Sequence, residues 1–564
     1  MASLAPYTGN WTRREAAHLL RRASFGASKA QLDAAVGAGL QTTLTSLFTP
    51  TAAPAVPVHP VDGSQWVPEE GKIWTSRVII GDQANAQTST AYDISRGAQY
   101  YNVVTKAWWT RNMIHAPVSI HEKLTLFWSN HFATEMTTVL NGIFSFNLLA
   151  YLRANAFGSV KDMARRVTLD PAMLVYLNGN VNTKGSANEN YGRELQELLT
   201  IGKGAEAGPG DYTTYTEDDV RAAARVLTGW RELGARDIVF TQGDRDLRDN
   251  PPKAQPQFPD NPNLIFIASQ HDTADKQFSP RYNNRVIKGR SGPNAGLDEL
   301  NDMLDMIFEQ EATALHIVTK LYRWFVCSAT PHDVVRDILQ PLANELYSNG
   351  YVVAPVLRKL LSSEHFFDQE LRGSQLRSPA DLVIGAMRTI PTWTPPTDPA
   401  QRDRFYMGYA ATLASLQMDL NDPSSVAGWE AYYQAPDYDK HWLSTATLPL
   451  RNAFTDALLF SNMSTGRRKV LESLEFAQTL SDPSDSLKLI DEVNEIFFAL
   501  PFSENVRMQL AEEVLMRGGR YYEWTEIWMA FQNNPTNGAN RDTVRVYLDR
   551  LFTYMFRMAE FQLG

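Results

Sequence analysis

The stretch NGNVNTKGSANENYGRELQELLTIG, residues 178–202, joins an amide-rich loop to a short, charged helix. Ser186 or Asn188 is placed to cap this helix, because either side chain can accept a hydrogen bond from a free backbone N–H. Gly202 is placed to end it. The loop contains five asparagines: Asn178, Asn180, Asn182, Asn188 and Asn190.

Helical spacing sorts the side chains of this segment into faces. Glu189, Arg193 and Glu197 lie four residues apart and share one face. Asn190, Glu194 and Glu197 form a second polar row. The apolar stripe consists of Leu195, Leu198, Leu199 and Ile201. The pattern predicts that the segment either lines a polar cleft or carries a buried polar network.

The composition is that of an ordinary globular protein. The chain has 564 residues, of which 44% are hydrophobic and 21% charged. The formal net charge is −10. An acidic chain without a basic run argues against nucleic acid or an anionic membrane as the main partner.

The N-terminal segment and the cysteine content bear on the cellular compartment of the protein. The single cysteine, Cys327, excludes an internal disulfide. The N-terminus lacks an apolar segment after a basic start, which predicts a cytoplasmic protein. Export by another route, or a signal removed from the sequence, stays open. No run of about 18 apolar residues occurs, so we expect a soluble protein without a membrane span.

Further outward, helical periodicity dominates. Helix starts are predicted at Thr12 with Glu15, at Ser119 with Glu122, at Asp170 before Pro171, and at Thr216. Short β-like runs interrupt the pattern only around 233–296. We therefore predict a mainly α fold, a large multi-helix globular array with a small β-hairpin insertion around 233–296.

A proline-rich joint at 391–400 suggests how the chain is organised. Residues 1–390 would form the main helical domain, which carries the polar site and the β insertion. Residues 391–564 would form a C-terminal helical region packed on it, so that the two make one continuous unit.

Seven phrases, in order along the chain, carry a family resemblance. They are AAHLLRRASFG (16–26), HEKLTLFWSNHFAT (121–134), DPAMLVYLNG (170–179), ANENYGRELQELLTIG (187–202), YTEDDVRAAARVLTGW (215–230), HDTADKQF (271–278) and SSVAGW (424–429). Together they resemble the bacterial family of domain of unknown function 1800, from about residue 12 to 460 and on toward the end. The resemblance implies shared descent and a mostly helical fold, but little chemistry.

The resemblance also implies a setting. Members commonly carry export signals and tend to be encoded beside a second uncharacterised family that resembles sulfatases and alkaline phosphatases, which points to envelope or glycan-related work. This chain lacks the signal, and Ser129 stands where the family phrase has a second histidine. The HExxH spacing of a zinc site is also absent. We predict no metal site and no cofactor.

The acidic residues suggest acid/base chemistry. Two carboxylates with different protonation states can cleave a glycosidic bond, and the candidates are Glu194, Glu189, Glu197 and Glu122. The alternative is a structural salt-bridge network that pairs these groups with Arg193 or with Arg225 of a neighbouring helix.

The residues expected to contact a substrate come from three segments. Asn188, Asn190, Arg193 and His131 would line the cleft. His271 and Asp272 would reach it from the β insertion. Trp230 and Trp429 follow glycines at loop junctions and would form cleft walls. The alternative is ordinary core packing for His131 and the tryptophans, and a turn with Asx bonding for His271 and Asp272.

We therefore expect a hydrolase that acts on a polar polymer such as a glycan, or on a small polar ligand. Glu194 or Glu189 would be the acid, and Glu122 or Glu197 the base. The alternative is a non-catalytic scaffold or binding protein that works with a phosphatase- or sulfatase-like protein partner. An open cleft with a carboxylate of raised pKa favours the enzyme, whereas carboxylates sealed against arginines favour the scaffold.

Overall fold

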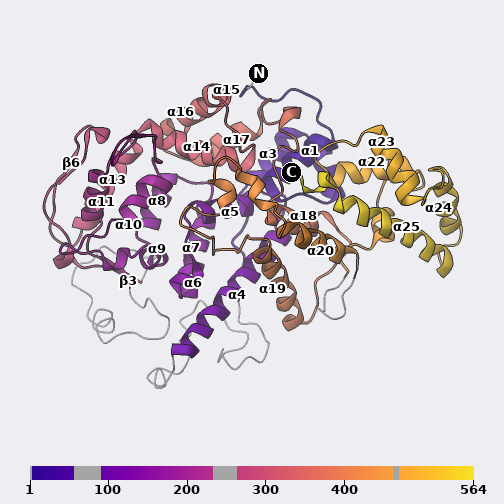
Figure 1. Cartoon of the computed structure of the whole chain (residues 1–564), viewed down its shortest axis with the longest axis horizontal. Helices are drawn as coiled ribbons and strands as arrows, with labels where there is room; N and C mark the ends of the chain where they lie inside the picture. The colour runs from indigo at the N-terminus through magenta and orange to yellow at the C-terminus, as the bar shows by residue number, and fades with distance from the viewer. Residues whose placement is uncertain (1–2, 56–90, 233–262, 461–468) are drawn as a thin grey trace.

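The computed structural model describes residues 3–55, 91–232, 263–460 and 469–564 (Figure 1). Helices dominate this part of the chain and confirm the mainly α class. The helices of the first third are α1 (Arg13–Ser24), α2 (Lys29–Ala38), α3 (Leu40–Leu47), α4 (Ala91–His115), α5 (His121–His131), α6 (Met136–Val139), α7 (Gly142–Ala154), α8 (Val160–Thr168), α9 (Pro171–Tyr176) and α10 (Glu189–Glu194).

The middle and the end of the chain are helical as well. The middle contains α11 (Glu217–Val226), α13 (Ala295–Phe308), α14 (Glu311–Phe325), α15 (His332–Val334), α16 (Gln340–Ser348), α17 (Val353–Leu361) and α18 (Pro379–Thr389). The last part contains α19 (Pro399–Ser415), α20 (Thr447–Leu459), α21 (Ser473–Ala477), α22 (Ser486–Phe497), α23 (Glu504–Gln509), α24 (Glu523–Asn533) and α25 (Gly538–Arg557).

Short helical turns complete the array. Three are π-helical: η2 (Leu195–Leu199), η5 (Val335–Leu339) and η9 (Leu510–Leu515). The 3₁₀ turns are η1 (Gly179–Val181), η3 (Ala268–Gln270), η4 (Pro280–Tyr282), η6 (Gln369–Leu371), η7 (Glu430–Tyr432), η8 (Tyr438–Trp442) and η10 (Ala559–Gln562).

Within the described residues, the strands form three antiparallel pairs. These are β1 (Glu206–Gly208) with β2 (Asp211–Tyr212), β3 (Trp230–Glu232) with β4 (Leu264–Phe266), and β5 (Lys276–Gln277) with β6 (Val286–Ile287). Strands β4, β5 and β6 lie in the predicted β insertion, whereas β3 lies just before it, and residues 233–262 lie outside the described residues. The β1–β2 hairpin was not predicted.

Side-chain caps explain where several helices begin. Thr12 and Glu15 form the predicted capping box of α1, and Thr216 forms one with Asp219 at α11. Asp170 caps α9 through the N–H of Ala172. Of the capping box predicted from Ser119 and Glu122, only the Ser119 half forms: its hydroxyl accepts from the N–H of His121 at 3.2 Å. The helix starts at His121, and the Glu122 carboxylate is drawn to Arg153 in the core.

Buried arginines satisfy carbonyls at the ends of helices. Arg388 donates to the carbonyls of Met113 at 3.0 Å and of Ala116 at 2.7 Å, at the end of α4. Arg21 donates to Phe498, just after α22. Burial lowers the pKa of Arg388 to about 10. These guanidiniums supply the donors that the last turn of a helix lacks.

Figure 1 shows how the helices are arranged: α22–α25 lie at one end of the molecule, and α10, α11 and α13 lie with the hairpins at the other. Helix α5 lies between them. The segment after residue 391 packs against the first part of the chain: α19 packs along α4, and α22 packs on α1. Buried apolar side chains from both parts form one contiguous core, from Ala16 to Phe561.

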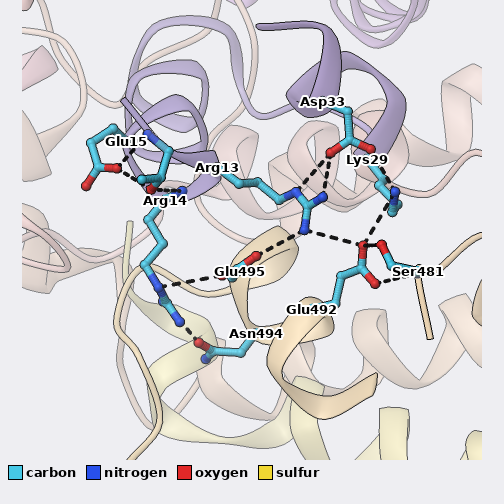
Figure 2. A network of polar contacts seen from close by, with 10 residues as sticks. Arg13, Arg14, Glu15, Lys29, Asp33, Ser481, Glu492, Asn494 and Glu495 are labelled. Carbon is cyan, nitrogen blue, oxygen red and sulfur yellow. Dashed lines mark hydrogen bonds and ion pairs between the residues drawn. The ribbon is translucent and has the colours of Figure 1, made fainter. Parts of the chain in front are cut away.

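A charged network joins the first two helices to α22 (Figure 2). Arg13 lies 2.7 Å from Asp33, 3.1 Å from Glu495 and 3.3 Å from Glu492. Lys29 lies 3.4 Å from the same Glu492 carboxylate. The Glu492 side chain is only 8% exposed, so its charge is compensated by cations that come from the opposite end of the sequence.

Glu492→Gln is therefore expected to lower the free energy of unfolding by about 1–3 kcal/mol, because two half-buried cations lose their shared counter-ion. Denaturant unfolding measures the change. Glu513→Gln, on the exposed side of the same region, is the control and should change stability by less than about 0.5 kcal/mol. Equal effects of the two substitutions would contradict a bracing role for the network.

Candidate functional site

The asparagine loop is fixed by its own amides. The buried Asn182 donates from Nδ2 to the carbonyl of Ala224 at 2.8 Å and accepts on Oδ1 from the N–H of Asn188 at 2.9 Å. Asn188 accepts in turn from the N–H of Asn190, so that Asn188, and not Ser186, caps α10. The side chain of Asn190 is exposed. Asn182 thus holds the loop against α11, and Asn188, a predicted cleft residue, caps α10.

The helix that follows the loop changes from an α-helix to a π-helical turn and ends before Gly202. Gly192 lets α10 approach α11, since a Cβ there would lie 3.1 Å from the backbone nitrogen of Ala224. Residues 195–199 then form the π-helical turn η2. Gly202 ends the segment as predicted, with φ +80°, and a Cβ on it would lie 2.4 Å from Nδ1 of His316.

Arg193 pairs with two carboxylates, those of Glu189 on the same helix and of Glu217 on α11. Both Arg193 terminal nitrogens lie 2.6 Å from the two carboxylate oxygens of Glu217, and Glu189 is 3.5 Å away. The guanidinium lowers the pKa of Glu217. Arg225, the other predicted partner, is paired with Asp272 at 2.7 Å. Glu189 is therefore part of an ion-pair network on the surface of α10.

Two donors contact Glu197. The hydroxyl of Tyr215 donates to its carboxylate at 2.7 Å, and the Lys203 ammonium lies 3.2 Å away. Tyr215 is fully buried, so this hydrogen bond orients the carboxylate from the protein interior.

Glu194 differs from its neighbours. Its side chain is half-buried and, within the described part of the chain, accepts no hydrogen bond and forms no ion pair. Burial raises the pKa of Glu194, and the adjacent Glu197 carboxylate raises it further, against the smaller opposing effects of Arg193 and Lys203. Glu194 and Glu197 are thus neighbouring carboxyl groups in opposite environments.

Donors from two other helices satisfy the carbonyls at the end of η2. His131 Nε2 donates to Leu199 at 3.0 Å, and His316 Nε2 donates to Leu198 at 3.2 Å. Lys320 Nζ lies 3.4 Å from the same Leu198 carbonyl. Burial lowers the pKa of His131 well below its ordinary range, that of His316 to about 3 and that of Lys320 to about 8. His131 therefore caps the acidic helix as a neutral ring.

These histidines predict an acid-labile fold. Because the pKa of each is lower in the folded than in the unfolded state, the unfolded chain binds more protons, and stability falls as the pH drops below about 6.5. Unfolding of the wild type and of His316→Asn, compared at about pH 7.5 and about pH 5, should show a smaller loss for the variant. An identical loss in both proteins would contradict a neutral His316.

The structure does not bring Glu122 to this carboxylate group. Glu122 lies in the core, where Arg153 Nε donates to it at 2.7 Å and Trp109 Nε1 at 3.1 Å. It begins α5, whereas His131 ends it, so about 14 Å of helix separates Glu122 from the end that contacts Leu199. Its carboxylate is sealed against an arginine.

The β insertion places His271 inside the protein as well. His271 Nδ1 donates to the Thr228 carbonyl at 2.9 Å, and Nε2 lies 3.2 Å from the Glu299 carboxylate. Lys276 Nζ lies 2.5 Å from the other oxygen of that carboxylate, and both side chains are fully buried. Burial alone would raise the pKa of Glu299, but the hydrogen bonds from His271 and Lys276 outweigh it and lower the pKa.

Asp272 and Trp230 belong to the same interior. Asp272 accepts from Arg225 Nε at 2.7 Å and from the N–H of Ala274 at 2.9 Å. Trp230 is 2% exposed and packs on Phe266, its partner across the β3–β4 pair, with ring centroids 4.8 Å apart. These contacts match the core-packing alternative for Trp230 and a structural turn at Asp272.

Trp429, the other predicted wall, lines a cavity. Its backbone N–H donates to Asn130 Oδ1 at 2.8 Å, which docks the loop after α19 onto the end of α5. Gly428 has φ +94°, and a Cβ there would lie 2.3 Å from Asn130 Oδ1. The cavity has a volume of about 520 Å³. Its lining includes Asp419, Asp422, Trp429, Glu430, His441 and Trp442.

The two aspartates of the cavity share one lysine. Lys106 Nζ lies 2.7 Å from Asp419 and 3.2 Å from Asp422. Asp422 also accepts from the N–H and the hydroxyl of Thr137, at 3.2 and 2.8 Å. Burial raises the pKa of Asp419 despite the opposing effect of Lys106.

Tyr176 connects this cavity with Glu194. Its hydroxyl donates to Glu135 at 3.0 Å. Burial raises the pKa of Tyr176, and the carboxylates of Glu135, Glu194 and Asp422 raise it further. The three acids therefore act electrostatically on one phenol, which contacts Glu135. We call Glu135, Glu194, Asp419 and Asp422 the acidic band.

Sequence reasoning identified Glu194 and Trp429 but missed Glu135, Asp419, Asp422 and His441. One local signal was available: the loop from Gln417 carries two aspartates three residues apart, next to Gln417 and Asn421, which both have positive φ. Their meeting with Tyr176 depends on contacts between segments far apart in the chain, which no local pattern shows.

Two further findings concern the residues that the structure describes. Among them, no group of three or more His, Cys, Asp or Glu side chains is arranged to hold a metal ion. Also within these ranges, every helix is too short or too polar to cross a membrane.

Comparison with known proteins places the chain in a family. No curated protein and no solved structure matches it. A family model described as "Protein of unknown function (DUF1800)" matches residues 18–563, from within α1 to the penultimate residue. The match covers the acidic helix, the β insertion and the cavity loop. The chain therefore belongs to the DUF1800 family.

Proposed function

We propose that this protein is a hydrolase that acts on a polar polymer such as a glycan, with Glu194 as general acid and Glu197 as general base. One observation carries the proposal: Glu194, which is half-buried, has a raised pKa and pairs with no described residue, lies one helical turn from Glu197, which is contacted by Tyr215 and Lys203. Two neighbouring carboxyl groups in different environments are the usual basis of acid/base hydrolysis.

The roles follow from these two environments. Glu194 would donate its proton to the oxygen that leaves, as the bond between that oxygen and the anomeric carbon breaks. Glu197 would take a proton from the water whose oxygen forms the new bond to that carbon. Glu189 and Glu122 fit these roles less well, because Arg193 and Arg153 neutralise them.

The cavity beside the acidic band supports a polymer substrate. Through Tyr176 the carboxylates of Glu194 and Asp422 lie in one electrostatic neighbourhood, and Asp422 lines the cavity. A chain bound in the cavity would extend along the acidic band toward α10. Trp429 and Trp442 form part of its wall, with 2% and 3% of their surface exposed.

A scaffold or binding protein is the second candidate, and a specific observation favours it. Glu122 and Glu299, two carboxylates of the interior, are sealed by Arg153 and by Lys276 with His271. A protein built on such networks can serve as a binding partner of a phosphatase- or sulfatase-like protein without catalysis of its own.

Incubation of the purified protein with a panel of polysaccharides, with and without chelator, separates the two candidates. The proposal predicts new reducing ends from at least one neutral or amine-bearing polymer, equally with and without chelator. Release that requires a metal would contradict the carboxylate mechanism. No release from any polymer, by a protein that still binds one, would favour the scaffold.

A further inference from the structure

We infer that the cavity lined by Asp419, Asp422, Glu430, His441 and the tryptophans binds an ammonium-bearing saccharide, such as an unacetylated amino sugar of a polymer. The inference deepens the proposed function by naming the substrate class, and it rests on that proposal only for the bond cleavage. Binding in the cavity can be measured without any reaction.

The charge of the cavity is the first argument. The cavity is lined by the carboxylates of Asp419, Asp422 and Glu430. Lys106 pairs with the two aspartates. Glu430 is exposed and has no ion-pair partner in the described ranges. The arrangement leaves a formal charge of about two negative units facing the cavity, which attracts a cation and repels an anion.

The surroundings strengthen this charge. Glu135 and Asp422 both raise the pKa of Tyr176, whose hydroxyl donates to Glu135 at 3.0 Å. A polymer of uronic acids or sulfated sugars would therefore meet like charge at the cavity. A polymer with ammonium groups would meet complementary charge there.

The aromatic and donor groups argue for a saccharide rather than a simple cation. Trp429 and Trp442 line the cavity, and indole rings attract cations and pack on sugar rings. Trp429 is 2% exposed, and its Nε1 donor has no hydrogen-bond partner among the described residues. Nε2 of His441 also has no hydrogen-bond partner among them. Hydroxyl oxygens of a sugar would satisfy such groups, which a metal ion or a simple amine would not.

The cavity also has a suitable size. Its volume of about 520 Å³ lies within the range of about 300–1,000 Å³ that is usual for small-molecule sites. That space accommodates one or two sugar units, with the remainder of a polymer outside. The predicted ligand is therefore a short glucosamine oligomer or the end of a longer chain.

Calorimetric titration of the full-length protein tests the inference with three matched oligomers: glucosamine, N-acetylglucosamine and galacturonate. We expect the glucosamine oligomer to bind about tenfold more tightly than the acetylated one, because only the first carries a charge. Added salt should weaken this binding. Galacturonate should not bind. Equal affinity for the charged and the acetylated oligomer would overturn the inference.

Variants locate the site. Glu430→Gln, at an exposed position, should weaken glucosamine binding about 2–5-fold without a change in folding. Glu526→Gln, which removes an exposed carboxylate on α24, is the control and should leave the affinity unchanged. Binding that both variants lower equally would show only non-specific attraction to an acidic protein, and would overturn the assignment to this cavity.

Glu194→Gln distinguishes the two proposals. If it abolishes hydrolysis and leaves glucosamine binding intact, both proposals stand. If glucosamine does not bind while an uncharged polymer is still hydrolysed through Glu194, the cavity inference fails and the proposed function stands. If glucosamine binds but nothing is hydrolysed, the proposed function fails alone.

Discussion

Glu299→Gln is expected to lower the free energy of unfolding by about 3–5 kcal/mol, because it leaves the ammonium of Lys276 buried without a counter-ion. Both side chains are fully buried, and the two charged atoms lie 2.5 Å apart. The substitution also weakens the contact with His271 and the hydrogen bond from the N–H of Arg290, at 2.7 Å. Denaturant titration followed by circular dichroism measures the change.

An exposed pair provides the matched control. Glu309 lies 3.0 Å from Arg285, and both side chains are about half exposed. Glu309→Gln should therefore cost less than about 1 kcal/mol. The double variant Glu299→Leu with Lys276→Met should recover much of the stability, since removal of both charges leaves no unpaired ion. A loss below about 1 kcal/mol for Glu299→Gln would contradict a structural role for this buried network. It would instead favour the predicted role of His271 and Asp272 in substrate contact.

Glu194→Gln is expected to reduce turnover of a responsive polymer about 10²–10⁴-fold, because glutamine cannot donate the proton that the leaving oxygen needs. The fold should persist, since no described side chain bonds to this carboxyl. Stability at neutral pH should rise slightly, because a carboxyl with a raised pKa favours the folded state only when protonated. Initial rates and thermal unfolding measure the two effects.

Glu189→Gln is the control for this substitution. Glu189 lies one turn earlier on the same helix, and its contact with Arg193 is 3.5 Å long, while Glu217 remains as the main partner of Arg193. Turnover should change less than about tenfold. If Glu194→Gln retains wild-type turnover, or if Glu189→Gln is equally inactive, the assignment of the general acid is wrong.

Local chemistry made much of the fold predictable. The capping boxes at Thr12 and Thr216 and the Asp170–Pro171 start are decided within four residues, so the sequence contains all the information they need. Ser119 shows the limit of that reasoning. Its phrase has the capping pattern, yet Glu122 gains more from the buried Arg153, which lies 31 residues away.

The candidate site was only partly predictable for the same reason. The rows on α10 placed Glu194 and Glu197 together correctly, because their spacing is local. The partners of these carboxylates are set by tertiary contacts. Arg193 pairs with Glu217, and the hydroxyl of Tyr215 donates to Glu197. The cavity forms from residues 414–444 docked on Asn130, a contact that spans about half of the chain.

The direct test of the account is the pKa of Glu194, which needs no substrate. Carbon-13 NMR of glutamate carboxyl groups, with the signal identified by its absence in Glu194→Gln, gives this value. The account predicts that Glu194 titrates above the ordinary glutamate value of about 4.3, and that Glu197→Gln lowers its pKa. A Glu194 that titrates at or below about 4.3, and does not respond to Glu197, would contradict the proposed acid and base.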